Sequence, residues 1–202
     1  MGQVVLSISM SLDGFVAGSN DCQQKPLGDD GDTLHAWMFS GDRTSEVNTF
    51  FKLSQIDRKV FDSAAEKTGA MIVGRRTYDI VKGWGESHPL KNVPVFVLTH
   101  SLPDEHPEGS TPFTFITDGI EQAVKQAKRA AGTKDVSVGT ASVAQQCIQA
   151  GLLEALDLHI APVLLGKGVR LFDHIGQDTV RLKSTEVLEG KGVVHVKYDI
   201  VK

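Results

Sequence analysis

Cysteine is scarce in this chain: among its 202 residues, only Cys22 and Cys147 carry a thiol. The two lie far apart in the sequence and form no CxxC motif, so neither a disulfide framework nor a cysteine-based zinc site is indicated. We expect Cys147 to pack inside a helix as a small apolar residue.

Long apolar runs and a strong net charge are also missing. No run approaches the ~20 apolar residues that a membrane-spanning helix needs. The chain enters a strand pattern at Val4, without the basic segment and cleavage site of a signal peptide. A net charge of −4 gives no general reason to bind nucleic acid or an acidic membrane. We therefore expect a cytoplasmic protein whose partner is a small molecule, with local groups meeting any anionic ligand.

Several catalytic motifs are absent as well. The sequence contains neither GxGxxG nor GxxxxGK(S/T), which argues against a standard Rossmann domain and against a P-loop NTPase. It also lacks HExxH and GxSxG, which argues against metal-dependent hydrolysis and serine-hydrolase chemistry. The seven histidines are scattered, and we expect each to be a surface or hydrogen-bonded residue rather than a metal ligand. No metal site is predicted.

The most informative stretch is residues 70–78, Ala-Met-Ile-Val-Gly-Arg-Arg-Thr-Tyr. Four consecutive apolar residues are typical of a central strand that is covered on both faces. The strand breaks at Gly74, and Arg75, Arg76 and Thr77 fall in the first turn of the helix that follows. A helix start offers unpaired N–H groups and a partial positive charge, and guanidinium groups add to it. The junction is thus either an anion site or an ordinary turn with two solvated arginines.

Two other strand ends have a similar character. The strand 136–138 breaks at Gly139 into a helix, and the strand 93–98 ends in Thr99-His100-Ser101. Small polar side chains at the end of a buried strand are well placed to bind a ligand. Together with Gly74, these strand ends could surround a phosphate-rich ligand such as a dinucleotide.

The hydrophobic patterns predict an α/β fold in one domain, residues 1–202. Parallel strands with crossover helices are expected through the middle of the chain, and an antiparallel hairpin at 180–201 should close the sheet edge. One long or two short helices are expected in 46–68. The segment 18–45 is rich in Gly, Asp and Asn but contains large apolar residues, so we expect an ordered lid there.

Four motifs, taken together, resemble those of a known family. They are Ser11-Leu-Asp-Gly-Phe-Val-Ala17, Gly74-Arg-Arg-Thr-Tyr78, Val138-Gly-Thr-Ala141, and Ala161-Pro-Val-Leu-Leu-Gly-Lys-Gly168 continued by Arg170-Leu-Phe172. In this order they resemble the dihydrofolate-reductase-like proteins related to the C-terminal reductase domain of the bifunctional riboflavin biosynthesis protein. The resemblance covers nearly the whole chain. It implies an eight-stranded, mainly parallel sheet, bound NADPH, a homodimer, and hydride transfer to a heterocycle or to a sugar-derived imine.

By position, the resemblance implies four regions of contact with NADPH. The helix start that holds the adenosine-side phosphates corresponds to Gly74, Arg75, Arg76 and Thr77. The strand end near the 2′-phosphate corresponds to Thr99, His100 and Ser101. The pyrophosphate turn corresponds to Gly139, Thr140, Ala141, Ser142 and Val143, although dihydrofolate reductases proper have paired glycines where this chain has Gly139-Thr140. The backbone wall behind the nicotinamide corresponds to Ser9, Val16 and Ala17.

The substrate side matches the family less closely. Dihydrofolate reductases have an acidic residue on the helix before the junction and an aromatic residue four positions later, and Asp57 and Phe61 have this spacing. Asp57 is either this acid or a helix N-cap. Trp37 and Trp84 either wall the pocket or cover the core. The segment 18–45 is longer than dihydrofolate reduction requires, so the substrate cannot be assumed to be dihydrofolate.

The sequence therefore predicts an NADPH-dependent reductase of the riboflavin-reductase type that acts on a small pyrimidine-like or pterin-like compound. Dihydrofolate reduction, or a non-catalytic dimer that binds a nucleotide, are the alternatives. Asp57 is predicted to supply or relay the proton that accompanies the hydride, with Asp62 and Glu66 on the same helix as alternatives.

Overall fold

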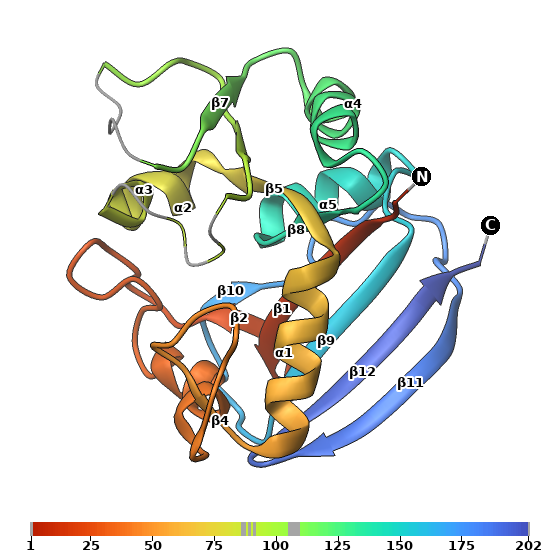
Figure 1. The fold of residues 1–202 in the computed structure, drawn as a ribbon. Helices are drawn as coiled ribbons and strands as arrows, with labels where there is room; N and C mark the ends of the chain where they lie inside the picture. Colours follow the sequence, from red (N-terminus) through yellow and green to blue (C-terminus); the bar gives the residue numbers. More distant parts are fainter. Residues whose placement is uncertain (1, 86–87, 89, 91, 105–109, 202) are drawn as a thin grey trace.

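A mixed sheet of eight strands forms the centre of the fold (Figure 1). The structure, a computed structural model, describes residues 2–85, 88, 90, 92–104 and 110–201. The strand order is β11-β12-β9-β1-β8-β5-β6-β7. The strands are β1 (Val4–Ser11), β5 (Thr68–Gly74), β6 (Val95–Leu98), β7 (Phe113–Ile116), β8 (Asp135–Val138), β9 (Ala155–Ala161), β11 (Leu182–Gly190) and β12 (Val193–Ile200).

The pairing of the strands confirms the predicted fold class. From β9 to β7 every neighbouring pair in the sheet is parallel, whereas β12 runs antiparallel to β9 and β11 antiparallel to β12. The C-terminal hairpin thus closes one edge of a mainly parallel sheet, as expected. Two small sheets organise the loops: β2 (Phe15–Ala17) pairs with β10 (Val169–Arg170), and β3 (Arg43–Thr44) pairs with β4 (Lys52–Leu53).

Helices cover both faces of the sheet (Figure 1). Helices α4 (Ile120–Ala131) and α5 (Ala141–Gln149) pack on one face, and α1 (Gln55–Lys67) crosses the other face. Cys147 is fully buried within α5, as predicted. The short helix α2 (Arg75–Ile80) follows β5 directly, and the turn labelled α3 (Lys82–Gly85) has a left-handed backbone at Gly83 and Trp84.

Strand β5 is buried on both faces, as its run of apolar residues predicted. Ala70 and Ile72 belong to the main core with α4 and α5. Their neighbours in the strand, Met71 and Val73, pack on the opposite face with Tyr78 of α2. Because successive side chains of a strand point to opposite faces, only an uninterrupted apolar run can fill both layers.

The helix expected in 46–68 begins later than its hydrophobic spacing suggested. Ser45 accepts hydrogen bonds from the N–H groups of Val47 and Asn48 (both 3.1 Å) and donates to Asp62, which holds the chain in a turn. The first residue of α1 is Gln55, and Ser54 is its N-cap. Local side-chain bonds of this kind compete with a helix and win here.

Asp57 is not the N-cap of α1, so that alternative is wrong. Its N–H group donates to Ser54 Oγ (3.3 Å), which places Asp57 in the first helical turn, and its own carboxylate points elsewhere. Among the described residues, no helix is both long enough and apolar enough to cross a membrane. The cytoplasmic location stays a prediction.

Replacing Ser54 by alanine removes the side-chain acceptor at the start of α1. We expect the free energy of unfolding to fall by about 1 kcal/mol, as measured by urea denaturation followed by circular dichroism. Ser54→Asn keeps an acceptor oxygen and is the matched control, which should stay close to the wild type. Equal unfolding free energies for Ser54→Ala and the wild type would contradict the capping role.

Candidate active site

A cleft of about 580 Å³ opens at the carboxyl ends of β5 and β6, beside the start of α5; we call it the strand-end cleft. These ends lie together because β5 has β6 and β8 as parallel neighbours, and α5 follows β8. The predicted cofactor residues that line it are Gly74, Arg75, Arg76, Thr99, His100, Ser101, Ser142 and Val143. Its lining is completed by Leu98, Thr117, Gly119 and Gln146.

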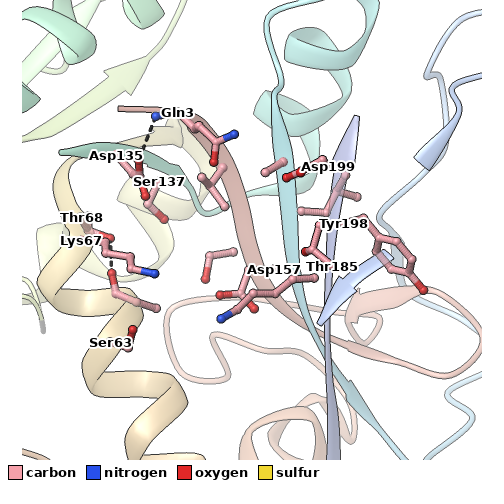
Figure 2. A pocket seen from close by; sticks show the side chains of 16 residues that line it. Gln3, Ser63, Lys67, Thr68, Asp135, Ser137, Asp157, Thr185, Tyr198 and Asp199 are labelled. Carbon is pink, nitrogen blue, oxygen red and sulfur yellow. Dashed lines mark hydrogen bonds between the residues drawn. The ribbon is translucent and has the colours of Figure 1, made fainter. Parts of the chain in front are cut away.

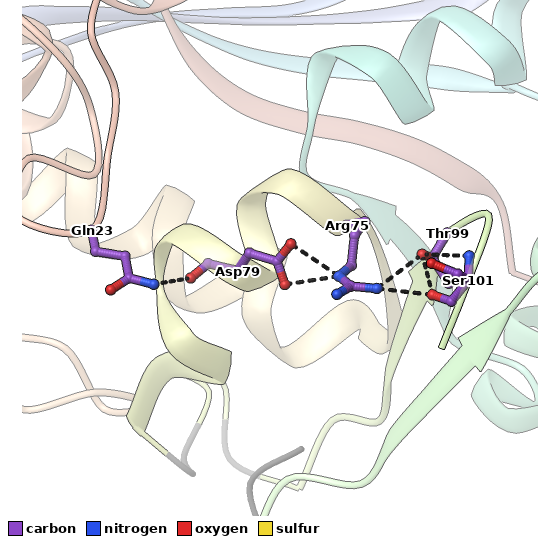
Figure 3. Close-up of polar contacts among 5 residues, drawn as sticks. All are labelled: Gln23, Arg75, Asp79, Thr99 and Ser101. Carbon is purple, nitrogen blue, oxygen red and sulfur yellow. Dashed lines mark hydrogen bonds and ion pairs between the residues drawn. The ribbon is translucent and has the colours of Figure 1, made fainter. Parts of the chain in front are cut away.

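Both arginines of the strand-end cleft form ion pairs with carboxylates, although the side chain of Arg76 is still 68% exposed. Arg75 Nε donates to both carboxylate oxygens of Asp79 (2.8 and 2.9 Å), while its Nη1 donates to Thr99 Oγ1 and to the Ser101 carbonyl oxygen (Figure 3). Arg76 donates to the carboxylate of Asp21 (2.6 and 3.0 Å). Asp79 thus fixes the orientation of a guanidinium whose Nη2 remains for a ligand.

A side chain locks the two strand-to-helix turns together. Thr140 is the N-cap residue of α5, yet its side chain does not cap that helix; its Oγ1 accepts the N–H of Gly74 (3.1 Å) instead. A Cβ atom at Gly74 would lie only 3.0 Å from Ser142 Oγ. The first turn of α5 therefore keeps its N–H groups free of a side-chain cap beside the strand-end cleft, which suits an anion.

The remaining predicted cofactor residues lie outside the strand-end cleft. Ser9 and Gly139 line a second pocket. Thr140 has the locking role just described. Like Thr140, four further residues line neither of the two pockets: Val16, Ala17, Thr77 and Ala141. Val16 and Ala17 belong to β2, whose partner strand is β10.

The second pocket, here called the aromatic pocket, measures about 420 Å³ and lies between α1 and the sheet. Phe61 and Trp84 line it, as predicted. The expected lid, residues 18–45, contains the 3-10 helix η1 (Gly31–Phe39), which contributes His35, Met38 and Phe39 to this pocket. Its other lining residues are Ser7, Ile8, Ser9, Phe51, Ala64, Ala65, Thr68, Met71, His88, Leu90, Ser137, Gly139 and His159.

Four phenylalanine rings form a continuous cluster at this pocket. Phe39, Phe50, Phe51 and Phe61 contact one another with ring centroids 5.1 to 5.8 Å apart. Phe50 is 70% exposed and Phe39 50% exposed, so the cluster reaches from the pocket to the surface. Exposed aromatic rings next to a pocket offer flat apolar surfaces to a planar ligand.

Three histidines that are scattered in sequence meet at the aromatic pocket: His35, His88 and His159. Burial lowers the pKa of all three, to about 4 for His88 and to about 3 for His159, where the neighbouring His195 adds to the decrease. Nδ1 of His35 is buried without a hydrogen-bond partner in the described part of the chain. All three rings are therefore neutral at pH 7, and no group of acidic, histidine or cysteine residues within the described ranges could hold a metal ion.

Asp57 does not line the aromatic pocket but reaches it through two histidines. Its Oδ1 lies 3.0 Å from His195 Nε2, and His195 Nδ1 lies 2.9 Å from His159 Nδ1. Trp37, expected either in the pocket wall or over the core, covers both histidine rings at centroid distances of 5.0 and 5.1 Å. Its Nε1 donates to Ser9 Oγ (3.1 Å).

Gly190 packs directly against Asp57 and His195 and leaves no room for a side chain. A Cβ atom at Gly190 would lie 2.0 Å from Asp57 Oδ1 and 2.9 Å from His195 Nε2. The chain reversal at Gly190 also brings the N–H of Lys191 to Asp57 Oδ2 (3.3 Å). The C-terminal hairpin therefore forms part of the surroundings of Asp57, although the two are far apart in the sequence. A short sequence motif cannot reveal such a contact.

Sequence reasoning missed His159 and His195, although a signal was present. In β9, Asp157 and His159 alternate with apolar residues, and in β12 His195 and Lys197 stand two positions apart. The register pairs His195 with His159 and Lys197 with Asp157. Polar side chains at alternate positions of two paired, otherwise apolar strands lie on the same face of the sheet. Such a face is a candidate for a functional site.

A smaller hollow of about 190 Å³ lies between α1 and the sheet at the start of the parallel strands (Figure 2). Asp157 lies there almost fully buried, and its Oδ1 has no hydrogen-bond partner among the described residues. Burial raises the pKa of Asp157, and Lys197 offsets part of that increase. The residues that this hollow shares with the aromatic pocket are Ser7, Ala64, Thr68 and Ser137.

Known proteins resemble this chain in sequence and in structure. Residues 3–196 match the family model of the RibD C-terminal domain. The uncharacterized protein YwjB of Bacillus subtilis is 25% identical over 185 residues, which cover 91% of each chain. A candidate riboflavin biosynthesis protein from Shewanella sp. PV-4 superposes with a TM-score of 0.72 and 21% identity, with both chains covered in full. The riboflavin biosynthesis reductase Rib7 of Saccharomyces cerevisiae superposes with a TM-score of 0.59 and 14% identity, over 99% of this chain and 90% of Rib7.

The two structural matches establish a shared fold, which is of the dihydrofolate-reductase-like type that the sequence motifs implied. The family match extends over nearly the whole chain and includes both strand-to-helix turns and the hairpin that carries His195. The relation inferred from the four motifs is thereby confirmed. The chain belongs to the RibD C-terminal domain family, which includes reductases of riboflavin biosynthesis.

Proposed function

We propose that this chain is an NADPH-dependent reductase that transfers a hydride to a small heterocyclic substrate or to a sugar-derived imine. The observation that carries the proposal is that a polar cleft and an aromatic pocket adjoin one turn. Gly139 lines the aromatic pocket, while Ser142 and Val143 of the same turn line the strand-end cleft. An extended dinucleotide along this turn would place its phosphates in the cleft and its nicotinamide ring in the pocket.

The residues of the strand-end cleft fit the phosphate groups of such a cofactor. Arg75 offers an oriented guanidinium, and the first turn of α5 offers backbone N–H groups that no side chain caps. His100 and Ser101 also line this cleft, and the family resemblance assigns them to an additional phosphate on the adenosine ribose. The cofactor supplies the hydride when it is bound, and the protein holds it in position and keeps water away.

The aromatic pocket favours a flat, partly polar substrate. Phe51, Phe61 and Trp84 provide apolar walls, and His35 offers a buried ring nitrogen without a partner in the described part of the chain. A pyrimidine or pterin ring needs both kinds of contact, because it has apolar faces and hydrogen-bonding edges. The similarity in structure to a 5-amino-6-(5-phosphoribosylamino)uracil reductase from Thermotoga maritima supports a substrate resembling that uracil compound.

Titration with NADPH, followed by fluorescence, tests the cofactor, and oxidation of NADPH in the presence of candidate substrates then tests the reaction. The panel consists of the aminouracil riboflavin precursor, dihydrofolate, and simple aldehydes or quinones. We expect oxidation with the aminouracil or a related imine. Oxidation with dihydrofolate alone would indicate dihydrofolate reduction, binding without any oxidation would indicate a non-catalytic sensor, and absence of binding would overturn the proposal.

Removing the guanidinium of Arg75 should reduce the preference for NADPH over NADH. A charge-assisted hydrogen bond to a phosphate contributes roughly 1.5–3 kcal/mol. The dissociation constant for NADH divided by that for NADPH should therefore fall about 10- to 100-fold in Arg75→Ala. Arg129→Ala, on the exposed side of α4, is the matched control and should leave the ratio unchanged. An unchanged ratio in both Arg75→Ala and Arg76→Ala would contradict the proposed contact between these arginines and the phosphate of NADPH.

We also propose a homodimer, as the family resemblance implies. The stretch 156–165 and the terminal hairpin are both expected to contribute to the interface. Leu156 and Leu158 are buried in the core of one chain, whereas Leu164 is 72% exposed. Val187 in β11 is 61% exposed. Light scattering at micromolar concentration should give twice the mass of one chain, and the interface should bury more than ~1,000 Å².

The variant Val187→Asp tests this assignment by placing a charge in the middle of the hairpin. We expect it to shift the equilibrium towards the monomer, because an unpaired charge cannot be buried at low cost. Leu102→Asp, in the exposed loop after β6, is the control and should remain dimeric. A wild-type mass of one chain would contradict the dimer itself.

A further inference from the structure

A buried row of three side chains leads from α1 to the aromatic pocket. Asp57 contacts His195 of β12, and His195 contacts His159 of β9, at 3.0 and 2.9 Å. Asp57 is 0% exposed and His195 1% exposed, whereas His159 lines the pocket. The row therefore has one end inside the protein and the other end where a substrate would lie.

The inner end of the row holds a carboxylate that needs a positive partner. Asp57 accepts the N–H of Lys191 and lies in the first turn of α1, where a carboxylate interacts favourably with the helix dipole. A buried carboxylate without a counter-charge is very unfavourable. His195, whose Nε2 faces Asp57 Oδ1, is the cation-forming group in contact with it. A proton on His195 therefore neutralises the inner end.

The protonation of His195 dictates the tautomer of His159. A doubly protonated His195 donates from Nε2 to Asp57 and from Nδ1 to His159 Nδ1, which must then accept. A neutral His159 that accepts at Nδ1 carries its hydrogen on Nε2. Nε2 is the ring nitrogen that His195 does not occupy, so it is the one available to a ligand in the aromatic pocket.

We propose that His159 is the proton donor of the reduction and that Asp57 and His195 are the positioning residues that supply it through this row, an assignment that rests on the proposed function. The sequence predicted that Asp57 supplies or relays the proton. Here His159 donates it, and Asp57 is connected to His159 through His195. Asp57 acts by holding the charge of His195, and His195 acts by holding the tautomer of His159.

The proposed step balances for the reduction of a C=N bond by the dihydronicotinamide of NADPH. The substrate carbon receives the hydride, and the π electrons of the double bond move to the nitrogen, which takes the proton from His159 Nε2. At the same time Nδ1 of His159 takes the proton from His195 Nδ1. His195 becomes neutral, and it keeps the proton on Nε2, which stays hydrogen-bonded to Asp57. The substrate gains one hydride and one proton, NADPH is oxidised to NADP⁺, and the row has lost one proton, which solvent must return.

The surroundings of the row keep His159 neutral. Burial and the charge of His195 lower the pKa of His159 to about 3, with smaller contributions from His35 on η1 and Lys197 on β12. His159 therefore passes a proton on without storing it. Asp157 on β9 and Glu186 on β11 both lie next to Lys197 in the register and add titratable carboxyl groups near the row.

Nitrogen-15 NMR of histidine-labelled protein tests the row without any cofactor or substrate. In the wild type at pH 7 we expect both ring nitrogens of His195 to be protonated and His159 to carry its hydrogen on Nε2. In Asp57→Asn the counter-charge is lost, so His195 should become neutral and His159 should switch its hydrogen to Nδ1. A neutral His195 in the wild type, or a His159 tautomer that does not respond to Asp57→Asn, overturns the proposal.

The wild-type measurement needs no variant, so it stands even where Asp57→Asn fails to fold. Single His→Gln variants assign the signals, and His174→Asn is the matched control, because that exposed residue has a left-handed backbone (φ 53°) that asparagine tolerates. The control should leave the signals of His159 and His195 unchanged.

Kinetics then separate the proton donor from the cofactor site. His159→Gln should lower the rate of NADPH oxidation ~10²- to 10⁴-fold, the range of general acid catalysis, while NADPH affinity stays within about twofold of the wild type. A full oxidation rate in His159→Gln overturns the role of His159 alone. Absence of NADPH binding by the wild type overturns the proposed function, and with it the use of the row in reduction, whatever the tautomers are.

Discussion

The common direction of the parallel strands is the constraint on which the rest of this structure depends. Strands β1, β5, β6, β8 and β9 all end at the same edge of the sheet, so whatever follows them in sequence is brought together there. That edge holds both the strand-end cleft and most of the aromatic pocket. The helices, the 3-10 segment and the C-terminal hairpin differ in length and composition, yet each is useful to the site only because the strands have already fixed where it can lie.

The parts of the site that sequence analysis located are those with a local cause. The break at Gly74 follows an apolar run, and the residues predicted to bind an anion come directly after it, so a window of a few residues contains the whole signal. The same holds for Thr99, His100 and Ser101 at the end of β6. The start of α1 was misplaced for the opposite reason, because the Ser45 side chain accepts hydrogen bonds from the N–H groups of Val47 and Asn48, and no hydrophobic spacing reports those bonds.

The three residues of the buried row are brought together by contacts between distant parts of the chain, and a single sequence does not reveal such contacts. Asp57 and His195 are 138 residues apart, and His159 and His195 are 36 residues apart. Their meeting requires the register of β12 on β9 and the absence of a side chain at Gly190. A one-residue slip in that register would turn His195 to the opposite face of the sheet, so the fold and this part of the site are specified by the same pairing.

The outer strand of the hairpin also limits how copies of this protein can meet. An edge strand presents unpaired N–H and C=O groups, which invite a further strand and can lead to aggregation. In β11 the ladder is interrupted between Ser184 and Glu186, and charged side chains such as Lys183 and Glu189 stand along the strand. Bulges and charges of this kind hinder the addition of another strand. Any association through the hairpin is thereby directed to its face, and the sheet is protected from growing across the boundary between molecules.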